Sequence, residues 1–373
     1  MRVLFDLTFV DPKSFSGVVI YALRLLKGFQ ESEKKNDIIL LVTEKNIDFI
    51  KKECNAFQSI SIQIKKSVLL TRFYFLTGYI HKNTINKIIK KNNISLFFSP
   101  FLQIGGLFTN IIPQVGVLHD AQGYILSKNN GSKGLVYRFF MSRLLNKIKE
   151  IVTISNFSKH SILKEISSLQ TSISVIYNSV ETPTVKKNIT FINHDPYILY
   201  INTLMPYKNL ETLVRAFAIL KDSINHKLII KAKELPYWHK TIMPLLNEFN
   251  IADRVFLIQE KYSDSKLASL YADADLFVTP SFMEGFGFTP IEAAMHYVPV
   301  ISSKESALFE TTLGLLNYYE PADDFKQLAN VIDKTLINKP SKEELIKISD
   351  CFKQTYSVKQ QIFFFKKLFN KYK

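Results

Sequence analysis

The sequence predicts an α/β fold made of two doubly wound parallel-sheet domains. The first observation is the stretch Pro280–Ser303, in which a glycine-bearing loop, a helix start and an apolar run follow the buried strand pattern of Leu276–Val278. That order is typical of the ligand-binding corner of an open parallel sheet. The second observation is that alternating strand and helix patterns begin at Val3 and begin again at Tyr197. The third is the length, because 373 residues suit two domains of ordinary size.

Composition narrows the class of protein. An apolar share of 47% is enough for two cores. Cys54 and Cys351 lie far apart and form no Cys/His cluster, which argues against a disulfide framework or a zinc site and is consistent with a reducing cytoplasm. The N-terminal apolar run contains Asp6 and lacks a small-residue cleavage site, so we interpret it as a strand rather than a signal peptide. No segment reads as a convincing membrane span.

The positive charge is concentrated in the first half. Residues 1–185 carry 24 Lys and Arg against 12 Asp and Glu (+12), whereas residues 186–373 carry 24 against 21 (+3). A basic half can face an anionic membrane leaflet or nucleic acid, or it can consist of solvated lysine-rich helix faces. The aromatic segment Val68–Ile80, with lysines following at 82, 87, 90 and 91, leaves a membrane-interface and a half-core interpretation open.

Two loops of the second half carry groups suited to phosphate. Lys208 lies between the predicted strand Tyr197–Ile201 and a predicted helix, where an ammonium suits a diphosphate; a solvated loop lysine is the alternative. In the second loop, Thr289-Pro290-Ile291-Glu292 predicts a helix start capped by Thr289, with Glu292 closing a capping box. The free N–H groups at that helix start would attract phosphate.

One motif identifies a family. Glu284 and Glu292 are separated by seven residues within PSFMEGFGFTPIEA, and PVISS follows. This context resembles the E-x7-E signature of the retaining glycosyltransferases of family 4, which have the two-domain GT-B fold. The loop NTLMPYKNL likewise resembles the family's GTLEPRKNL, with Asn202 in place of a glycine and Tyr207 in place of an arginine. The resemblance is strong over the second half of the chain and weak over the first.

The resemblance implies two Rossmann-like domains that face each other across a cleft. We expect an acceptor-side domain over residues 1–182, a linker over 183–196 and a nucleotide-sugar domain over 197–355. The C-terminal helix, 356–373, would cross back to the first domain.

The resemblance also implies roles for individual residues. Glu284 and the backbone of Gly285–Phe288 would hold the donor sugar, and Glu292 would accept hydrogen bonds from the ribose, with the capping box as its alternative role. Lys208 would stabilise charge on the diphosphate. The predicted catalytic residues are His119 and Glu284, and the predicted donor-binding residues are Gly17, Lys208, Gly285, Phe286, Gly287, Phe288, Thr289 and Glu292.

Two of these residues lie in the first half. His119 ends the predicted strand Val115–Leu118, where open sheets place ligands and where the family has a histidine near the transferred sugar. A purely structural histidine is the alternative. Gly17 stands where the family has a glycine loop after the first strand, and a turn glycine that needs a positive φ is the alternative.

The resulting hypothesis is a retaining, metal-independent hexosyltransferase (EC 2.4 class). It would move a hexosyl group from a UDP- or GDP-linked sugar to a glycan or lipid-linked oligosaccharide in lipopolysaccharide or capsule biosynthesis, in the cytoplasm or peripherally on the inner face of the cytoplasmic membrane. No cofactor, metal or nucleic-acid partner is expected: the Asp273-Ala274-Asp275 triplet precedes a strand, and the lysines form no aromatic-basic motif. The alternatives are a nucleotide-sugar epimerase on the same scaffold and a non-catalytic nucleic-acid binder.

Overall fold

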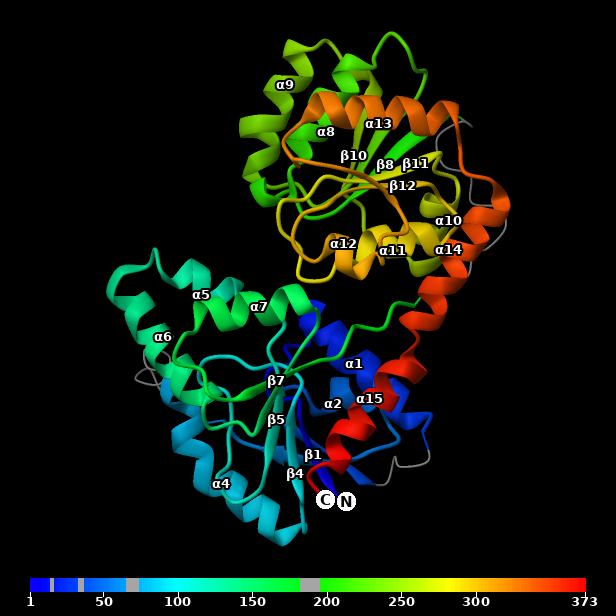
Figure 1. The fold of residues 1–373 in the computed structure, drawn as a ribbon. Coiled ribbons are helices and arrows are strands. Elements are labelled where there is room, and N and C mark those ends of the chain that lie inside the picture. Colours follow the sequence, from blue (N-terminus) through cyan, green and yellow to red (C-terminus); the bar gives the residue numbers. More distant parts are fainter. Residues whose placement is uncertain (14–16, 33–36, 65–73, 182–194) are drawn as a thin grey trace. The chain divides into compact units, whose positions relative to one another are not determined.

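The structure is a computed structural model that describes residues 1–13, 17–32, 37–64, 74–181 and 195–373 (Figure 1). The chain forms two compact units. Unit 1 comprises Met1–Ser179 together with Val358–Lys373, and unit 2 comprises Val180–Ser357. The linker expected at 183–196 lies outside the described residues up to position 194, and so does the part of the aromatic segment that precedes residue 74.

Unit 1 is built on a seven-stranded parallel sheet with the order β3-β2-β1-β4-β5-β6-β7. The strands are β1 (Val3–Asp6), β2 (Ile38–Thr43), β3 (Gln58–Ile62), β4 (Leu96–Ser99), β5 (Gln114–Val117), β6 (Glu150–Thr153) and β7 (Ser172–Val175). From β1 the chain moves outward to β3 and then crosses to β4. The switch point of this sheet, where open α/β folds bind ligands, therefore lies between β1 and β4.

Unit 2 repeats the plan with a six-stranded parallel sheet of order β10-β9-β8-β11-β12-β13. The strands are β8 (Tyr197–Ile201), β9 (Lys227–Lys231), β10 (Val255–Ile258), β11 (Leu276–Thr279), β12 (Val300–Ser303) and β13 (Asn317–Tyr319). The switch point lies between β8 and β11, which pair through Leu276–Ile198 and Phe277–Leu199. These two parallel sheets confirm the predicted α/β class. The class could be predicted because strands that are buried on both faces have continuous apolar sequences.

Helices connect the strands of both units. In unit 1 they are α1 (Gly17–Gln30), α2 (Ile47–Glu53), the 3₁₀ turn η2 (Tyr74–Leu76), α4 (Thr77–Lys91), α5 (Gln122–Ser127), α6 (Gly131–Leu145), α7 (Asn156–Glu165) and α15 (Val358–Asn370). In unit 2 they are η4 (Pro206–Lys208), α8 (Leu210–Ile219), the π-helix η5 (Trp238–Ile242), α9 (Met243–Glu248), η6 (Ala252–Arg254), α10 (Asp264–Ala272), α11 (Phe288–Met295), α12 (Leu308–Thr311), α13 (Phe325–Ile337) and α14 (Lys342–Thr355). Figure 1 shows α8 and α13 on one face of the second sheet and α11 and α12 on the other.

The last helix, α15, packs on unit 1 through one apolar face. Phe365 and Phe369 are buried, and both rings contact Phe98 of β4 at centroid distances of 5.4 and 5.1 Å. The helix approaches α1 closely at Gly28, where an added Cβ would lie 2.7 Å from the Ile362 side chain. A small residue in α1 is therefore what allows this close helix contact.

Serine side chains cap the N-termini of several helices. Ser155 accepts a hydrogen bond from the Ser158 N–H (3.0 Å), and Ser263 caps α10 in the same way. Ser341 forms a full capping box with Glu344 at the start of α14. Each cap satisfies an N–H group that the helix itself leaves without a partner.

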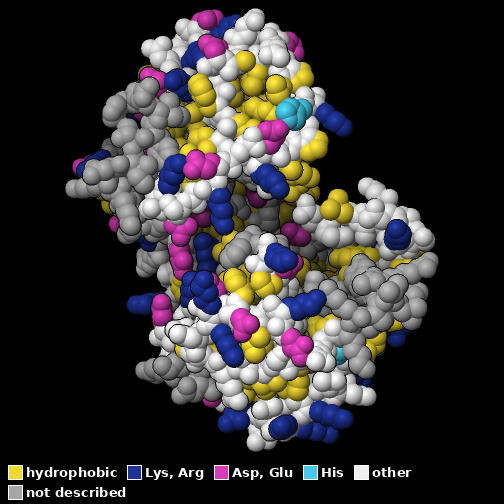
Figure 2. All heavy atoms as spheres, turned by 180° about the vertical axis from the view of Figure 1, so that it is seen from behind, with side chains coloured by type: hydrophobic (Ala, Val, Ile, Leu, Met, Phe, Trp, Pro, Cys, Tyr) yellow, Lys and Arg dark blue, Asp and Glu magenta, His cyan; other side chains and the backbone are white. Residues whose placement is uncertain are grey.

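The charged side chains on one face of the molecule do not gather into a single stripe (Figure 2). On the face drawn in Figure 2, lysine and arginine side chains are dispersed, and acidic side chains lie among them. None of the helices in the described ranges combines the length and the apolarity needed to cross a bilayer.

Candidate active site

The candidate site lies where β8 and β11 end, at the switch point of the unit 2 sheet. Two loops leave this edge: residues 202–209 follow β8, and residues 280–287 follow β11. Because neighbouring parallel strands end at the same edge, side chains from both loops can meet there. Lys208 comes from the first loop and Glu284 from the second.

Asn209 ties the two loops together. Its backbone is left-handed (φ 56°), a conformation that asparagine tolerates better than most residues. Its buried side-chain amide donates to the carbonyls of Pro280 (2.9 Å) and Ala322 (2.8 Å) and accepts from the Thr212 hydroxyl (2.8 Å). The residue next to Lys208 is thus fixed to the segment that leads into the Glu284 loop.

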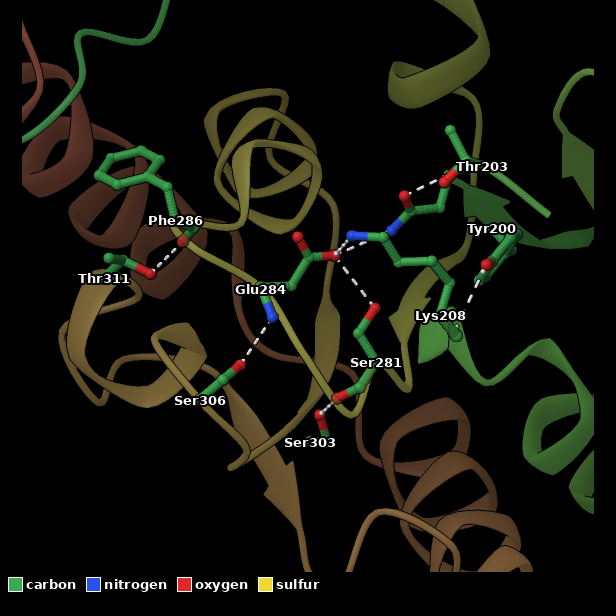
Figure 3. A network of polar contacts seen from close by, with 10 residues as sticks. Tyr200, Thr203, Lys208, Ser281, Glu284, Phe286, Ser303, Ser306 and Thr311 are labelled. Carbon is green, nitrogen blue, oxygen red and sulfur yellow. Dashed lines mark hydrogen bonds and ion pairs between the residues drawn. The ribbon is translucent and has the colours of Figure 1, made fainter. Parts of the chain in front are cut away.

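The carboxylate of Glu284 receives three hydrogen bonds on one oxygen. Its Oε1 accepts from the Lys208 ammonium (2.7 Å), the Asn202 amide (3.0 Å) and the Ser281 hydroxyl (3.1 Å). Figure 3 shows Lys208 and Ser281 converging on this oxygen while the second carboxylate oxygen points away from them. Among the residues that the structure describes, all the hydrogen bonds and ion pairs of the carboxylate fall on Oε1.

The backbone of the Glu284 loop is held from the next strand connection. The Glu284 N–H donates to the Ser306 hydroxyl (2.8 Å), and the Glu284 carbonyl accepts from the Ala307 N–H (3.3 Å). Ser306 adopts a left-handed backbone (φ 56°), which is uncommon for serine. Such strained positions concentrate at functional sites.

Lys208 and Glu284 form a nearly buried ion pair. Their side chains are only 11% and 13% exposed. Burying two charges is tolerated when they pair and when their remaining hydrogen-bonding groups are satisfied. The Lys208 ammonium also lies 5.0 Å from the centre of the Tyr207 ring, so the tyrosine that replaces the family's arginine contributes a cation–π contact rather than a second cation.

Helix α11 begins earlier than predicted. Its N-cap is Gly287, with φ 86°, and the helix runs from Phe288 to Met295. The prediction that Thr289 caps the helix is therefore wrong, and Thr289 lies inside the first turn. Gly287 can adopt the left-handed conformation at no steric cost, which moves the start of the helix two residues upstream. A Cβ at Gly287 would also lie 2.7 Å from the Leu308 side chain.

Glu292 does not close a capping box. Its Oε2 accepts a hydrogen bond from the Tyr271 hydroxyl of α10 at 2.9 Å. Burial, reinforced by the neighbouring Glu292 charge, raises the pKa of Tyr271 well above its usual value. Tyr271 therefore stays protonated and donates to the carboxylate, which fixes the orientation of Glu292 one turn inside the helix.

The other predicted donor residues differ in how they face the site. The Phe286 side chain is buried, where its ring contacts Phe288 (5.0 Å) and Tyr356 (5.3 Å), and its carbonyl accepts from the Thr311 hydroxyl. Gly285 and Phe288 are half-buried at the surface of the loop. The ring of Phe286 therefore belongs to the core, and only its backbone can take part in donor binding.

The two predicted residues of unit 1 have contrasting surroundings. His119 follows β5 and is surrounded by aromatic rings, with Tyr21 at 4.6 Å and Phe101 at 6.1 Å between ring centres. Its Nε2 lies 3.3 Å from the carbonyl oxygen of Pro100, just after β4. Burial lowers the pKa of His119 to about 4, so the imidazole is neutral at pH 7.

Gly17 begins α1 without a left-handed backbone. No described atom lies within 4 Å of the position that a Cβ would occupy. The interpretation as a turn glycine with positive φ is therefore wrong. The preceding loop residues, 14–16, lie outside the described part of the chain, and close approach to a ligand stays a prediction.

Several members of the network were missed from the sequence. Asn202 and Ser281 lie within the quoted motifs, but nothing in the sequence predicts their contacts with Glu284, and the same holds for the contacts of Ser306 and Tyr271. Their contacts join positions far apart in the chain, as with Asn202 and Glu284, which are 82 residues apart. The Asp273–Asp275 triplet lies away from this network: Asp275 pairs with Lys339 and lies 3.8 Å from His226.

Comparison with known proteins places this geometry in context. Residues 182–350 match the family described as "Glycosyl transferases group 1". The O-antigen chain mannosyltransferase RfbU of Salmonella typhimurium is 26% identical over 315 residues, which cover 84% of this chain and 85% of that protein.

Two solved structures share the fold over nearly the whole chain. Sucrose-phosphate synthase from Thermosynechococcus elongatus superposes with a TM-score of 0.76 at 17% identity, covering 99% of this chain and 98% of that one. Anabaena HepE in complex with UDP-glucose gives a TM-score of 0.67 at 14% identity, with both chains fully covered. The predicted GT-B fold is confirmed. The segment 182–350, which carries the candidate site, thus matches the glycosyl transferases group 1 family, and the chain is a glycosyltransferase.

Proposed function

We propose that this chain is a retaining transferase that moves a hexosyl group from a nucleotide sugar to a glycan or lipid-linked acceptor in cell-surface polysaccharide synthesis. The observation that carries the proposal is the Lys208–Glu284 pair, 2.7 Å apart at the switch point of the unit 2 sheet. The pair offers a cation for the diphosphate and, beside it, a carboxylate for the hydroxyls of the sugar. Those are the two chemical parts of a nucleotide sugar that lie next to the bond to be broken.

The charge that develops during transfer suits this corner. As the bond between the sugar's anomeric carbon and the diphosphate breaks, its electron pair leaves on a phosphate oxygen, and an acceptor hydroxyl forms the new glycosidic bond. Lys208 and the N–H groups at the start of α11, near Thr289, stabilise the departing negative charge. This positive charge from the protein supports transfer without a metal ion.

Glu292 holds the ribose in this proposal. A carboxylate accepts two hydroxyl donors well, and Tyr271 fixes its orientation from the side of α10. The Gly285–Phe288 backbone contacts the sugar. In unit 1, His119 is neutral and so supplies a hydrogen bond rather than a charge to the transferred sugar. Gly17 allows close backbone approach at the start of α1.

Mannose is the first candidate for the transferred sugar, because RfbU is named a mannosyltransferase. The name of HepE in complex with UDP-glucose supports a nucleotide-sugar donor of the same general type. The nucleotide of the donor is identified by comparing UDP-linked with GDP-linked hexoses in the transfer assay.

The acceptor side includes a surface suited to an anionic membrane leaflet. Helix α6 exposes Leu135, Val136 and Phe139, which are 60%, 40% and 54% exposed, and it contains no acidic residue. Lys133 and Arg143 are exposed on the same helix, and the Arg143 guanidinium lies over the Phe139 ring at 5.1 Å. Apolar side chains among cations favour binding at a negatively charged lipid surface.

The test of this surface is sedimentation with lipid vesicles. We expect vesicles that contain phosphatidylglycerol to bind the protein and vesicles of phosphatidylcholine alone to bind it weakly, with Phe139→Glu reducing the bound fraction. Ile337→Glu, at a 71% exposed apolar position of unit 2, is the matched control. If both mutants and the wild type bound the vesicles equally, α6 would not be the membrane-binding surface.

The function itself is tested with a transfer assay on purified protein, using GDP- and UDP-hexoses and lipid-linked acceptors extracted from membranes. We expect nucleoside diphosphate release that depends on acceptor and persists in a chelator, with the donor's anomeric configuration retained in the product. Absence of release with every donor would contradict the proposal. A change in the donor sugar without acceptor would instead identify an epimerase.

A further inference from the structure

We propose that Asn202 is a positioning residue that holds the Glu284 carboxylate in place when a bound diphosphate draws Lys208 away from it. The inference rests on the proposed function, since it assigns a step in donor binding. Asn202 stands at the end of β8, at a position where the motif of the family has glycine. The side chain is thus a feature of this chain rather than of the motif.

The orientation of the Asn202 amide is fixed by its two contacts. Its Oδ1 accepts from the Thr203 N–H at 2.9 Å, and a backbone N–H can only donate. The other end of the amide is therefore the NH₂ group, which donates to Glu284 Oε1 at 3.0 Å. The amide connects the β8 loop to the β11 loop independently of Lys208.

One donor on Glu284 Oε1 is in excess. A carboxylate oxygen has about two lone-pair directions, yet Oε1 receives Lys208, Asn202 and Ser281. If the Lys208 ammonium moves to a phosphate, Asn202 and Ser281 still occupy both directions. The carboxylate then keeps its position and loses its counter-charge, which makes its other oxygen a better acceptor for a sugar hydroxyl.

This arrangement predicts different effects on the two parts of the donor. Asn202 acts on the carboxylate that faces the sugar, whereas the diphosphate is held by Lys208 and by the start of α11. Removing the amide should therefore weaken binding of a nucleotide sugar but not of the nucleoside diphosphate alone. A merely structural role would change both affinities together.

The experiment compares Asn202→Gly with the wild type by calorimetry, using UDP, GDP and the nucleotide sugar that the transfer assay identifies. We expect the nucleoside diphosphate Kd to stay within about twofold and the nucleotide-sugar Kd and kcat/KM to worsen by about tenfold, since a hydrogen bond to a charged group is lost. Thr203→Gly is the matched control: it loosens the same loop but keeps the amide, and it should affect both ligands equally and little. Melting curves verify that the variants are folded.

A second variant gives a distinct pH signature. Asn202→Asp places two carboxylates at hydrogen-bond distance, and like charges there favour sharing one proton. Its kcat/KM should therefore recover as the pH falls, which Asn202→Gly should not do. Equal loss of UDP or GDP and nucleotide-sugar binding in Asn202→Gly, or no loss of either, would overturn the role of Asn202. Wild-type protein that binds neither ligand would instead defeat the proposed function on which this role depends.

Discussion

The titratable side chains at the carboxyl edges of the two sheets have opposite kinds of surroundings. In unit 2, Lys208 and Glu284 are nearly buried and remain a close pair, surrounded by amides and hydroxyls. In unit 1, His119 is half-buried beside the rings of Tyr21 and Phe101, and its pKa is lowered to about 4. The edge of unit 2 holds an ion pair, whereas the edge of unit 1 favours the neutral form of its histidine.

The difference follows from what surrounds each group. A buried charge persists when a partner of opposite sign and further hydrogen bonds replace its water. The half-buried His119 imidazole, which has one carbonyl contact and aromatic neighbours, lacks such compensation, so its neutral form is favoured. We therefore expect the Lys208–Glu284 pair to suit the charged part of the proposed substrate and the neutral His119 to suit its uncharged hydroxyls.

Of the substitutions that test this comparison, removal of Lys208 should have the largest effect on activity. Lys208→Ala takes away the cation that we propose stabilises the leaving diphosphate, and we expect kcat/KM to fall by about 10³-fold, toward the upper range for loss of one charge-stabilising donor. The substitution also leaves Glu284 without its cation and should lower the free energy of unfolding. Lys208→Ala combined with Glu284→Gln should recover stability without recovering activity. Recovery of both would show that Lys208 acts only on folding.

The neutral state of His119 can be tested through the pH dependence of stability. The unfolded chain binds a proton at His119 below pH 6.5, whereas the folded protein does so only near pH 4. Stability should therefore fall as the pH falls from 6.5 to 4, by up to about 3 kcal/mol from this group. His119→Gln should flatten that part of the curve in chemical denaturation measured at several pH values. An unchanged slope would mean that His119 is already charged in the folded state.

Glu284→Gln sharpens the comparison by keeping the shape of the side chain and removing its charge. We expect kcat/KM to drop by about 10²-fold because a charged acceptor for the sugar is replaced by a neutral amide. Affinity for UDP or GDP alone should rise or stay level, since Lys208 no longer has a competing carboxylate. Weaker nucleotide binding would contradict the separate roles of the two residues.

The smallest effect is expected at an ion pair of the same unit that is open to solvent. Lys304 pairs with Glu320 at 2.6 Å, and both side chains are substantially exposed (40% and 59%). Lys304→Ala should change the free energy of unfolding by less than about 1 kcal/mol and leave kcat/KM unaltered. A large loss of activity would show that lysines near this edge act through general charge rather than through the position of Lys208.

Most of the fold could be predicted from the sequence because buried parallel strands leave a continuous apolar run. The strand predicted over Tyr197–Ile201 has the bounds of β8, and the strand pattern of Leu276–Val278 lies within β11. The three-residue edge strand β13 (Asn317–Tyr319) and the π-helix at Trp238–Ile242 were missed, since neither has a distinctive period.

The candidate site could be predicted only in part. Lys208 and Glu284 could be predicted because they lie in the two loop motifs NTLMPYKNL and PSFMEGFGFTPIEA, and the structure brings their side chains together. The helix start was misplaced because a threonine before a proline is a good cap in isolation, whereas Gly287 can take a conformation closed to other residues. The contacts of Asn202 and Ser306 with Glu284 depend on which strands are neighbours, and that information is not local.

The proposed contact of Lys208 with the donor diphosphate is tested by the affinity of the protein for UDP and GDP, measured by calorimetry with the wild type and with Lys208→Ala. We expect one of the two nucleotides to bind the wild type and the substitution to weaken its binding by at least about tenfold, because a point charge beside the diphosphate is lost. Equal affinity in the two proteins would contradict it, as would the failure of both nucleotides to bind.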